Sequence, residues 1–289
     1  MVTDYPGPLV SIEWLEANIK RSDVKVIEVD YDPATAYFVG HIPGALLIDW
    51  KRDLNKYPER DIIDPVGFEK LMARLGVENG DHVILYGDYN NWFAAFTYWV
   101  FKMYGHQRLS LLDGGRSKWI ALGKPMSRPA SKEPPRADRE SSYRVVTVDS
   151  RYRVFFLDVL RRLHNPNTVL VDVRSPEEYR GDITAPPEYP EEQAQRGGHI
   201  PGALNIPWKQ AVRDDGTFKS PEELRSLYET KGVTPDKEVI MYCRIGERAS
   251  HTWFVLKELL GYPNVAVYDG SWSEWGNMVR APVKRGDEP

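Results

Sequence analysis

A seven-residue segment that occurs twice constrains this chain more than any other feature. Gly40-His41-Ile42-Pro43-Gly44-Ala45-Leu46 returns unchanged as Gly198–Leu204, 158 positions later. Further landmarks repeat in the same order at a spacing of 156, among them Tyr86 with Tyr242 and Asp113-Gly114 with Asp269-Gly270. Solenoid repeats have periods of about 20–50 residues, so a period of this length indicates a duplicated domain.

The length of the chain agrees with a duplication. Its 289 residues fit two domains of about 100–150 residues, the usual size of a domain. Residues 124–143 are rich in proline and charge and have no apolar periodicity, which is typical of a linker. We therefore expect an N-terminal domain over residues 1–123, a linker over 124–143 and a C-terminal domain over 144–289.

Short runs rich in Val, Ile and Leu alternate with longer amphipathic runs in both copies. The predicted strands are Val24–Val29, His82–Tyr86, Ser110–Leu112, Thr168–Val173, Glu238–Tyr242 and Val265–Tyr268. The predicted helices are Ser11–Ile19, Val66–Leu75, Trp92–Met103, Pro221–Tyr228 and Arg248–Leu260. Apolar strands separated by helices favour a mainly parallel sheet with helices on both faces. The predicted fold class is α/β, present twice.

Charge and hydropathy argue against several classes of function. The chain has 38 basic and 42 acidic residues and a net charge of −4, without the basic stripe that a nucleic-acid partner requires. Its apolar runs are shorter than the roughly 20 residues that span a bilayer. Met1–Pro8 lacks the basic and apolar stretches of a secretory signal. We expect a cytoplasmic protein with no nucleic-acid or membrane partner.

The chain contains a single cysteine, Cys243. An intramolecular disulfide is therefore excluded, and a zinc site built on cysteine is not expected. Cys243 follows directly on the predicted strand Glu238–Tyr242, and ligands of open α/β sheets bind at the carboxyl ends of strands. A lone cysteine is often an inert buried side chain. A position before a glycine-containing loop bracketed by Arg244 and Arg248 favours a nucleophile instead.

The residues after Cys243 are suited to stabilise a sulfur anion. Amides at a helix N-terminus form a concavity that binds anions, and the helix dipole adds to it. Neighbouring cations such as Arg244 and Arg248 lower the pKa of a thiol, and Gly246 permits a positive φ. Burial acts in the opposite direction. These influences predict a depressed pKa of about 6–7.5 for Cys243.

Three motifs occur in order along the chain: the two Gly-His-Ile-Pro-Gly-Ala boxes, the loop Cys243–Arg248, and Asp269-Gly270-Ser271-Trp272. Together they resemble tandem-domain rhodaneses, in particular thiosulfate sulfurtransferases of the actinobacterial type. The resemblance covers nearly the whole chain outside the linker. It implies an enzyme in which Cys243 takes the outer sulfur of thiosulfate as a persulfide and releases sulfite. Cyanide, a thiol or a protein thiol would accept that sulfur, without a metal or cofactor.

The resemblance also suggests which residues bind the substrate. Arg248, as the preferred contact, and Arg244 would hold the sulfonate oxygens, and the rest of the loop would complete the site with Ile245, Gly246 and Glu247. Glu247 is equally consistent with a structural pairing to a neighbouring arginine. His41 and His199 recur in both copies, so they are expected to maintain the fold.

Asp172 and Arg174 resemble an Asp-x-Arg sequence in the family's second domain and are further candidates for the site. Some vertebrate-type relatives carry an arginine where this chain has Glu178, so that substrate contact is not transferred. Arg174, Arg180 and Arg196 are candidate substitutes.

The two copies differ in two places that bear on function. The position equivalent to Cys243 is Gly87 in the first copy, followed by Asp88, so the N-terminal domain is predicted to be catalytically silent. The second copy carries an insertion within 181–197, because Asp172 to Gly198 spans 26 positions where Asp30 to Gly40 spans 10. The insertion is consistent with either an active-site rim or a plain surface loop.

Three other functions compete with this hypothesis. A 3-mercaptopyruvate sulfurtransferase usually has a small or neutral residue after the cysteine, whereas Arg244 suits a doubly charged donor. A cysteine phosphatase or arsenate reductase commonly places five residues between Cys and Arg, and only four separate Cys243 from Arg248. A non-catalytic sulfur-carrier scaffold would not require the retained thiol.

Overall fold

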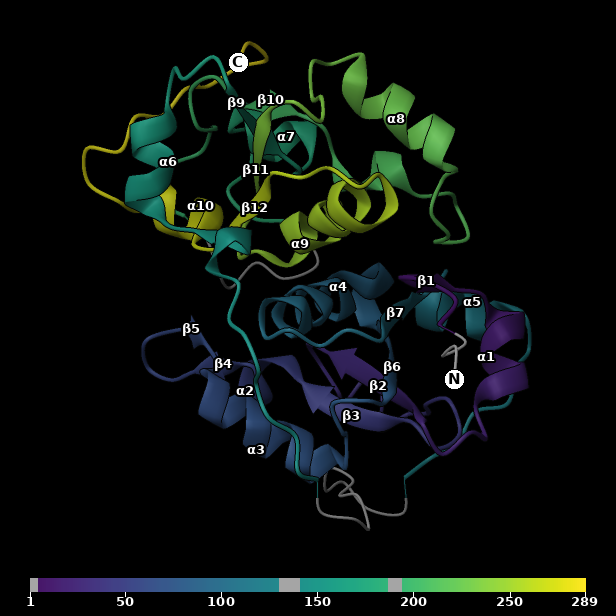
Figure 1. Cartoon of the computed structure of the whole chain (residues 1–289). Coiled ribbons are helices and arrows are strands. Elements are labelled where there is room, and N and C mark those ends of the chain that lie inside the picture. Colours follow the sequence, from purple (N-terminus) through teal and green to yellow (C-terminus); the bar gives the residue numbers. More distant parts are fainter. Residues whose placement is uncertain (1–4, 130–140, 187–193) are drawn as a thin grey trace. The chain divides into compact units, whose positions relative to one another are not determined.

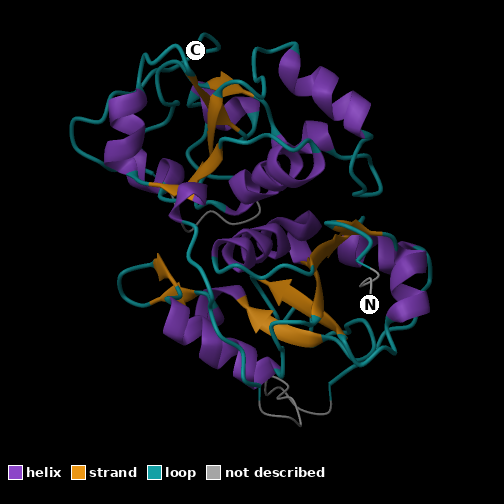
Figure 2. Ribbon diagram, viewed as in Figure 1, coloured by secondary structure: helices purple, strands orange, loops and turns teal. Residues whose placement is uncertain are grey.

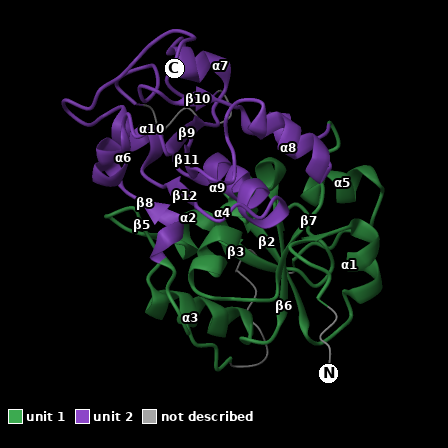
Figure 3. Cartoon of the chain, turned by 45° about the horizontal axis from the view of Figure 1, so that its top comes forward, with its two compact units in different colours: residues 1–149, 214–218 green, residues 150–213, 219–289 purple. Residues whose placement is uncertain are grey.

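The computed structural model describes residues 5–129, 141–186 and 194–289. The chain divides into two compact units, residues 1–149 with 214–218 and residues 150–213 with 219–289 (Figure 3). The middle of the expected linker, 130–140, and residues 187–193 of the insertion lie outside the described residues. Tyr143, at the end of the expected linker, is buried in the first unit, where its ring lies 5.7 Å from that of Phe68.

The first unit contains a five-stranded parallel sheet (Figure 1). Its strands are, in spatial order, β1 (Leu9–Val10), β7 (Leu109–Leu112), β6 (His82–Gly87), β2 (Val24–Asp30) and β3 (Leu46–Asp49). Its helices are α1 (Ile12–Asn18), α2 (Trp50–Asp53), α3 (Pro65–Leu75), α4 (Asp88–Met103) and α5 (Gly115–Ala121). A small antiparallel hairpin, β4 (Asn55–Lys56) with β5 (Asp61–Ile62), completes the unit.

The second unit repeats this topology. Its parallel sheet has the order β8 (Arg153–Val154), β12 (Val265–Tyr268), β11 (Glu238–Tyr242), β9 (Thr168–Asp172) and β10 (Leu204–Asn205). Its helical elements are η1 (Ser150–Tyr152), α6 (Phe156–Arg162), α7 (Pro176–Arg180), η2 (Trp208–Ala211), α8 (Pro221–Glu229), α9 (Glu247–Phe254), the π-helical turn η3 (Val255–Leu259) and α10 (Ser271–Trp275). The same strand order in both units confirms the duplicated α/β fold, with helices on both faces of each sheet (Figure 2).

Local sequence signals explain where the helices begin and end. At the start of α3, Asp64 accepts a hydrogen bond from the amide of Gly67 at 2.8 Å, and Pro65 occupies the first turn. Gly76 ends the helix with a φ of 61°, a conformation that costs glycine little. The helix α8 starts at a capping box formed by Ser220 and Glu223.

The sheet cores explain why the central strands read as continuous apolar runs. In the second unit, Leu170 of β9 and Ile240 of β11 are buried together with the aromatic rings of Tyr242, Trp272 and Trp275. The helix α9 packs against β11 and β12. Strands buried on both faces carry apolar residues at successive positions, as parallel sheets require.

The repeated box has the same structural role in both units. Tyr86 accepts a hydrogen bond from the amide of Ile42 at 2.9 Å, and Tyr242 accepts one from Ile200 at 3.1 Å. The rings of His41 and His199 stack on Tyr37 and Tyr179, with centroids 3.9 and 3.7 Å apart. These contacts support the expectation that both histidines maintain the fold.

Candidate active site

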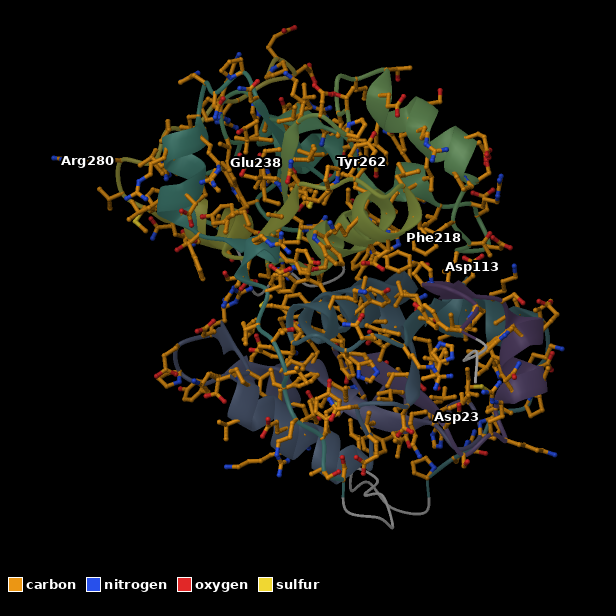
Figure 4. The ribbon with its side chains drawn as sticks, in the orientation of Figure 1. Asp23, Asp113, Phe218, Glu238, Tyr262 and Arg280 are labelled. Atoms are coloured by element: carbon orange, nitrogen blue, oxygen red, sulfur yellow. The ribbon has the colours of Figure 1, made fainter. Side chains whose placement is uncertain are left out.

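The cysteine lies at the carboxyl end of the central strand β11, in the loop that leads to α9. Cys243 is fully buried, and Gly246 turns the loop with a φ of 99° immediately before the helix starts at Glu247. Glu238, labelled in Figure 4, begins the same strand at its other end. Arg162 Nε donates to the Glu238 carboxylate at 2.9 Å. The strand, loop and helix therefore follow one another as predicted, and they bring the thiol to the edge where α/β sheets bind ligands.

The thiol contacts both backbone amide and carboxylate groups. The sulfur of Cys243 accepts a hydrogen bond from the amide of Gly246 at 3.2 Å and donates one to Oε2 of Glu247 at 3.2 Å. The amide of Ile245 donates to the same carboxylate oxygen at 3.3 Å. The loop amides therefore divide between the sulfur and Glu247, whereas the sequence predicted that they would serve the sulfur.

The expected depression of the thiol pKa is wrong for this structure. Burial is the largest influence, and together with the carboxylate of Glu247 it raises the pKa of Cys243 to about 12. Arg248 and the amide of Ala249 act in the opposite direction but are outweighed. The arginines and the helix N-terminus can be seen in the sequence, whereas the turn of the Glu247 carboxylate towards the sulfur cannot.

The guanidinium of Arg248 is held by two carboxylates. It donates to Glu178 through Nη1 at 2.7 Å and Nη2 at 3.0 Å, and through Nε to Glu247 at 3.3 Å. Burial opposes ionisation of Glu178, but the charge and hydrogen bonds of Arg248 lower the pKa of Glu178 to about 2. Its role as the preferred sulfonate contact therefore remains a prediction.

Glu178 is a site residue that sequence reasoning missed. It is the third residue of α7, where its carboxylate also accepts the amide of Ser175 at 3.1 Å. The Ser-Pro-Glu-Glu sequence signals that cap. No local sequence pattern indicates that Glu178 pairs with Arg248, 70 positions away. The sequence shows only that this position is a glutamate and not an arginine.

Arg174 and Asp172 form a buried ion pair at the end of β9. Arg174 Nε lies 3.0 Å from Oδ1 of Asp172, Nη2 lies 2.5 Å from Oδ2, and the same nitrogen donates to the carbonyl of Gly198 at 2.7 Å. The guanidinium also lies 4.5 Å from the ring of Trp272. The pair connects β9 to the repeated box at Gly198–Leu204 and to α10. A part of Asp172 and Arg174 in substrate binding stays a prediction.

Two other candidate arginines, Arg180 and Arg196, are engaged elsewhere. Arg196 donates to four carbonyl oxygens, those of Trp275, Gly276, Met278 and Ala281. Arg180 donates to Asp182 at 2.8 Å. Arg244 is buried with 1% of its surface exposed, and its carbonyl accepts the amide of Ser273 at 3.0 Å.

Ser271 and Trp272 hold the cysteine loop in place through hydrogen bonds to the backbone of Cys243. Ser271 adopts a φ of 50°, accepts the amide of Cys243 at 3.2 Å and donates to the carbonyl of Tyr268 at 2.7 Å. The amide of Trp272 donates to the carbonyl of Cys243 at 3.1 Å. The Asp269–Trp272 motif therefore positions the cysteine loop, a role that its sequence alone does not reveal.

Comparison with known proteins identifies the family. The pattern of the rhodanese-like domain matches residues 11–122 and 157–278. The chain belongs to the rhodanese-like family. It is 50% identical over 287 residues to the Thermus thermophilus "Sulfur carrier protein TtuD", covering 98% of this chain and 99% of that one. It is 51% identical over 278 residues to a Mycolicibacterium smegmatis protein named "Putative thiosulfate sulfurtransferase", covering 96% and 98%.

A solved rhodanese structure resembles the chain as well. SseA from Escherichia coli, described as a 3-mercaptopyruvate sulfotransferase with the rhodanese fold, superimposes with a TM-score of 0.75 at 28% identity. The match covers 91% of this chain and 98% of SseA. Both rhodanese-like domains of the chain are therefore found together in proteins of nearly the same length.

The first rhodanese-like domain has no thiol at the equivalent position, and its backbone leaves no room for one. A Cβ atom on Gly87 would lie 1.9 Å from the carbonyl oxygen of Val29, because β6 pairs with β2 as far as this residue. Three left-handed residues follow, Tyr89, Asn90 and Asn91, and the side chain of Asn91 accepts the amide of Gly87 at 3.0 Å. The two domains therefore differ in loop geometry as well as in sequence.

This edge of the first domain is lined by carboxylates. Asp30 accepts the amide of Asp88 at 3.2 Å, and Asp88 accepts the amides of Tyr31 and Asp32. Burial raises the pKa of Asp88 to about 7. Acidic side chains and the backbone of Gly87 therefore occupy the edge that carries the thiol in the second domain.

Proposed function

We propose that the protein is a thiosulfate sulfurtransferase in which Cys243 carries the transferred sulfur. The observation that carries this proposal is the buried thiol at the end of β11, held by the Gly246 amide and in contact with Glu247. The Mycolicibacterium relative, with its printed name and 51% identity, supports the donor. The Thermus relative, named as a sulfur carrier, supports transport of sulfur on the protein.

The reaction consists of two displacements at sulfur. The sulfur of Cys243 forms a bond to the outer sulfur of thiosulfate while the sulfur–sulfur bond of thiosulfate breaks, and sulfite leaves with that electron pair. An acceptor such as cyanide, a thiol or a protein thiol then attacks the outer sulfur of the persulfide and frees the cysteine. Covalent catalysis of this kind predicts ping-pong kinetics.

The residues around Cys243 suit this chemistry. The Gly246 amide can donate to an anionic sulfur. Arg244 and Arg248 supply positive charge for the sulfonate oxygens, with the charge of Arg248 shared with Glu178. The loop Ile245-Gly246-Glu247 surrounds the sulfur, and the Asp172–Arg174 pair supports the neighbouring strand. We assign no metal or cofactor to the reaction.

The N-terminal rhodanese-like domain, placed at residues 1–123, is proposed to be silent. Gly87 cannot accept a side chain without displacing β2, so no thiol can take the place of Cys243 in this domain. The C-terminal domain, placed at 144–289, would contain all the residues that bind the donor.

A cytoplasmic location is part of the proposal, because a catalytic thiol needs a compartment that keeps cysteine reduced. Among the described residues, helices are too short or too polar to span a bilayer.

Two other functions have specific support. The SseA structure supports 3-mercaptopyruvate as an alternative donor, whereas Arg244 beside the nucleophile favours a more highly charged one. The Thermus relative supports a sulfur carrier that hands its sulfur to a protein rather than to a small molecule.

A direct assay separates these possibilities. Thiocyanate formation from cyanide should be measured with thiosulfate and with 3-mercaptopyruvate, using the wild type and Cys243→Ser. We expect a higher kcat/KM for thiosulfate and no activity in the variant. A higher kcat/KM for 3-mercaptopyruvate would contradict the proposed donor, and activity that survives Cys243→Ser would contradict the proposed nucleophile.

A further inference from the structure

The contact between Cys243 and Glu247 raises the question of where the thiol proton goes. Both side chains are fully buried, and the sulfur donates its hydrogen bond to Oε2 of Glu247 at 3.2 Å. The carboxylate is therefore in direct contact with the atom that must become a nucleophile. A base within hydrogen-bond reach of the proton meets the first geometric requirement for general base catalysis.

The resting thiol needs such a base. Burial and the nearby carboxylate raise the pKa of Cys243, which favours the protonated thiol in the resting protein. Only the thiolate is an effective nucleophile. The same carboxylate that keeps the thiol protonated at rest can remove its proton when a sulfur donor arrives.

We propose that Glu247 is a catalytic residue that accepts the proton of Cys243 during attack on the sulfur donor and returns it when the acceptor removes the sulfur. This inference rests on the proposed sulfurtransferase function. It gives Glu247 a role different from substrate binding.

The steps balance in atoms, protons and charge. In the first step the S–H bond of Cys243 breaks, its proton bonds to Oε2 of Glu247, and its electron pair forms the new bond to the outer sulfur of the donor. Sulfite departs with the electrons of the broken bond, leaving an anionic persulfide beside a neutral carboxylic acid. In the second step cyanide takes the outer sulfur as thiocyanate, and Glu247 returns the proton to Cys243.

The surrounding groups favour both proton positions. With the thiol protonated, the carboxylate of Glu247 accepts the Ile245 amide at 3.3 Å and Arg248 Nε at 3.3 Å. With Glu247 protonated, the persulfide anion no longer faces a carboxylate and can accept a hydrogen bond from the acid. The Gly246 amide, 3.2 Å from the sulfur, is already placed to stabilise an anion there.

The test is the pH dependence of sulfur uptake in Glu247→Gln, which keeps the side-chain size and an acceptor oxygen but cannot take a proton. Single-turnover release of sulfite from thiosulfate should be followed between pH 6 and 10. We expect a loss of about 10²–10⁴-fold at pH 7, the usual contribution of a general base. The rate of the variant should then climb with pH as thiolate forms, whereas the wild-type rate should be flat across neutral pH.

Two further variants keep the test decisive. Glu178→Gln removes the other buried carboxylate that contacts Arg248 but does not contact the sulfur, so its pH profile should keep the wild-type shape. Glu247→Asp retains a carboxylate and should retain the flat region even if its rate falls. If Glu247→Gln does not fold, the Asp variant alone decides, and a steep profile in that variant would contradict the inference.

Failure of the inference differs from failure of the proposed function. A Glu247→Gln variant that takes up sulfur at pH 7 as fast as the wild type, with the same pH profile, would show that Glu247 only sets the charge around the thiol. A wild type that releases no sulfite from thiosulfate would instead overturn the proposed donor.

Discussion

Arg248 and Glu178 form a two-bonded ion pair, with Nη1–Oε2 at 2.7 Å and Nη2–Oε1 at 3.0 Å, although 70 positions separate them in the chain. Their side chains are 3% and 1% exposed. The pair connects the first turn of α9 to the first turn of α7, and Arg248 in turn contacts Glu247 beside the nucleophile. Arg248 therefore both places a positive charge in the cysteine loop and connects α9 to α7.

Replacing Arg248 with Ala should lower the free energy of unfolding of the second unit, in addition to removing a proposed substrate contact. It leaves Glu178 buried without its partner, which costs about 3–5 kcal/mol of unfolding free energy. Urea denaturation measures the loss. The matched control is Arg213→Ala, whose pair with Glu223 is exposed and should contribute about 0–1 kcal/mol. Equal effects of the two substitutions would contradict the structural role of the buried pair.

The same pair predicts a loss of stability in acid. Arg248 lowers the pKa of Glu178 to about 2 from 4.5, so the stabilisation is present above pH 4.5 and is lost as the pH falls towards 2. A shift of this size corresponds to at most about 3 kcal/mol. Unfolding free energies of the wild type and Glu178→Gln should converge over this range. A difference that stays constant with pH would show that the ionisation of Glu178 contributes little.

Gly87 explains why a cysteine cannot simply be restored to the first domain. Gly87→Cys places a Cβ atom 1.9 Å from the backbone oxygen of Val29, so we expect a loss of roughly 3 kcal/mol or more, at the upper end of overpacking effects. Gly80→Ala, where no atom lies within 4 Å of the added Cβ, is the matched control and should change stability little. Thermal unfolding compares them. A stable Gly87→Cys variant that takes up sulfur at residue 87 would contradict the proposed silence of this domain.

The long central elements of the fold were predictable because their patterns are local. The predicted strands Glu238–Tyr242 and Val265–Tyr268 coincide with β11 and β12, and the predicted helix Val66–Leu75 differs from α3 by one residue. Edge strands such as β1 and β10 have only two residues. Segments that short carry no periodicity, and pairing with a neighbouring strand alone defines them.

One predicted helix differs in helix type from the structure, and another begins where the regular part of α4 begins. The predicted helix Arg248–Leu260 is α9 followed by the π-helical turn η3, which repetition of apolar residues cannot distinguish from α-helix. The segment before Trp92 contains three left-handed residues, Tyr89–Asn91. Asn91 is fixed there by hydrogen bonds to Gly87 and to Leu112 of the neighbouring strand.

The candidate site was predictable only along the cysteine loop. The position of Cys243 at a strand end and the left-handed Gly246 follow from adjacent residues. The partners Glu178 and Ser271 approach from segments 70 and 28 positions away. The thiol pKa was mispredicted for a different reason, because burial outweighs the arginines and the side chain of Glu247 turns towards the sulfur.

Alkylation by iodoacetamide tests the raised thiol pKa. Burial and Glu247 favour the protonated thiol, so labelling of the folded protein should be slow at pH 7 and should still rise through pH 10. The same protein unfolded in urea should titrate near the free-cysteine value of about 8.5, and Cys243→Ser should not be labelled. A plateau below pH 8 in the folded protein would show that the arginines and loop amides outweigh burial.

The mass of the intact protein after exposure to thiosulfate tests the central claim most directly. Covalent transfer to Cys243 predicts an increase of about 32 Da, one sulfur atom, that cyanide removes and that Cys243→Ser does not show. Peptide mapping should place the added sulfur on Cys243. An unchanged mass under conditions in which the wild type forms thiocyanate would contradict the persulfide mechanism.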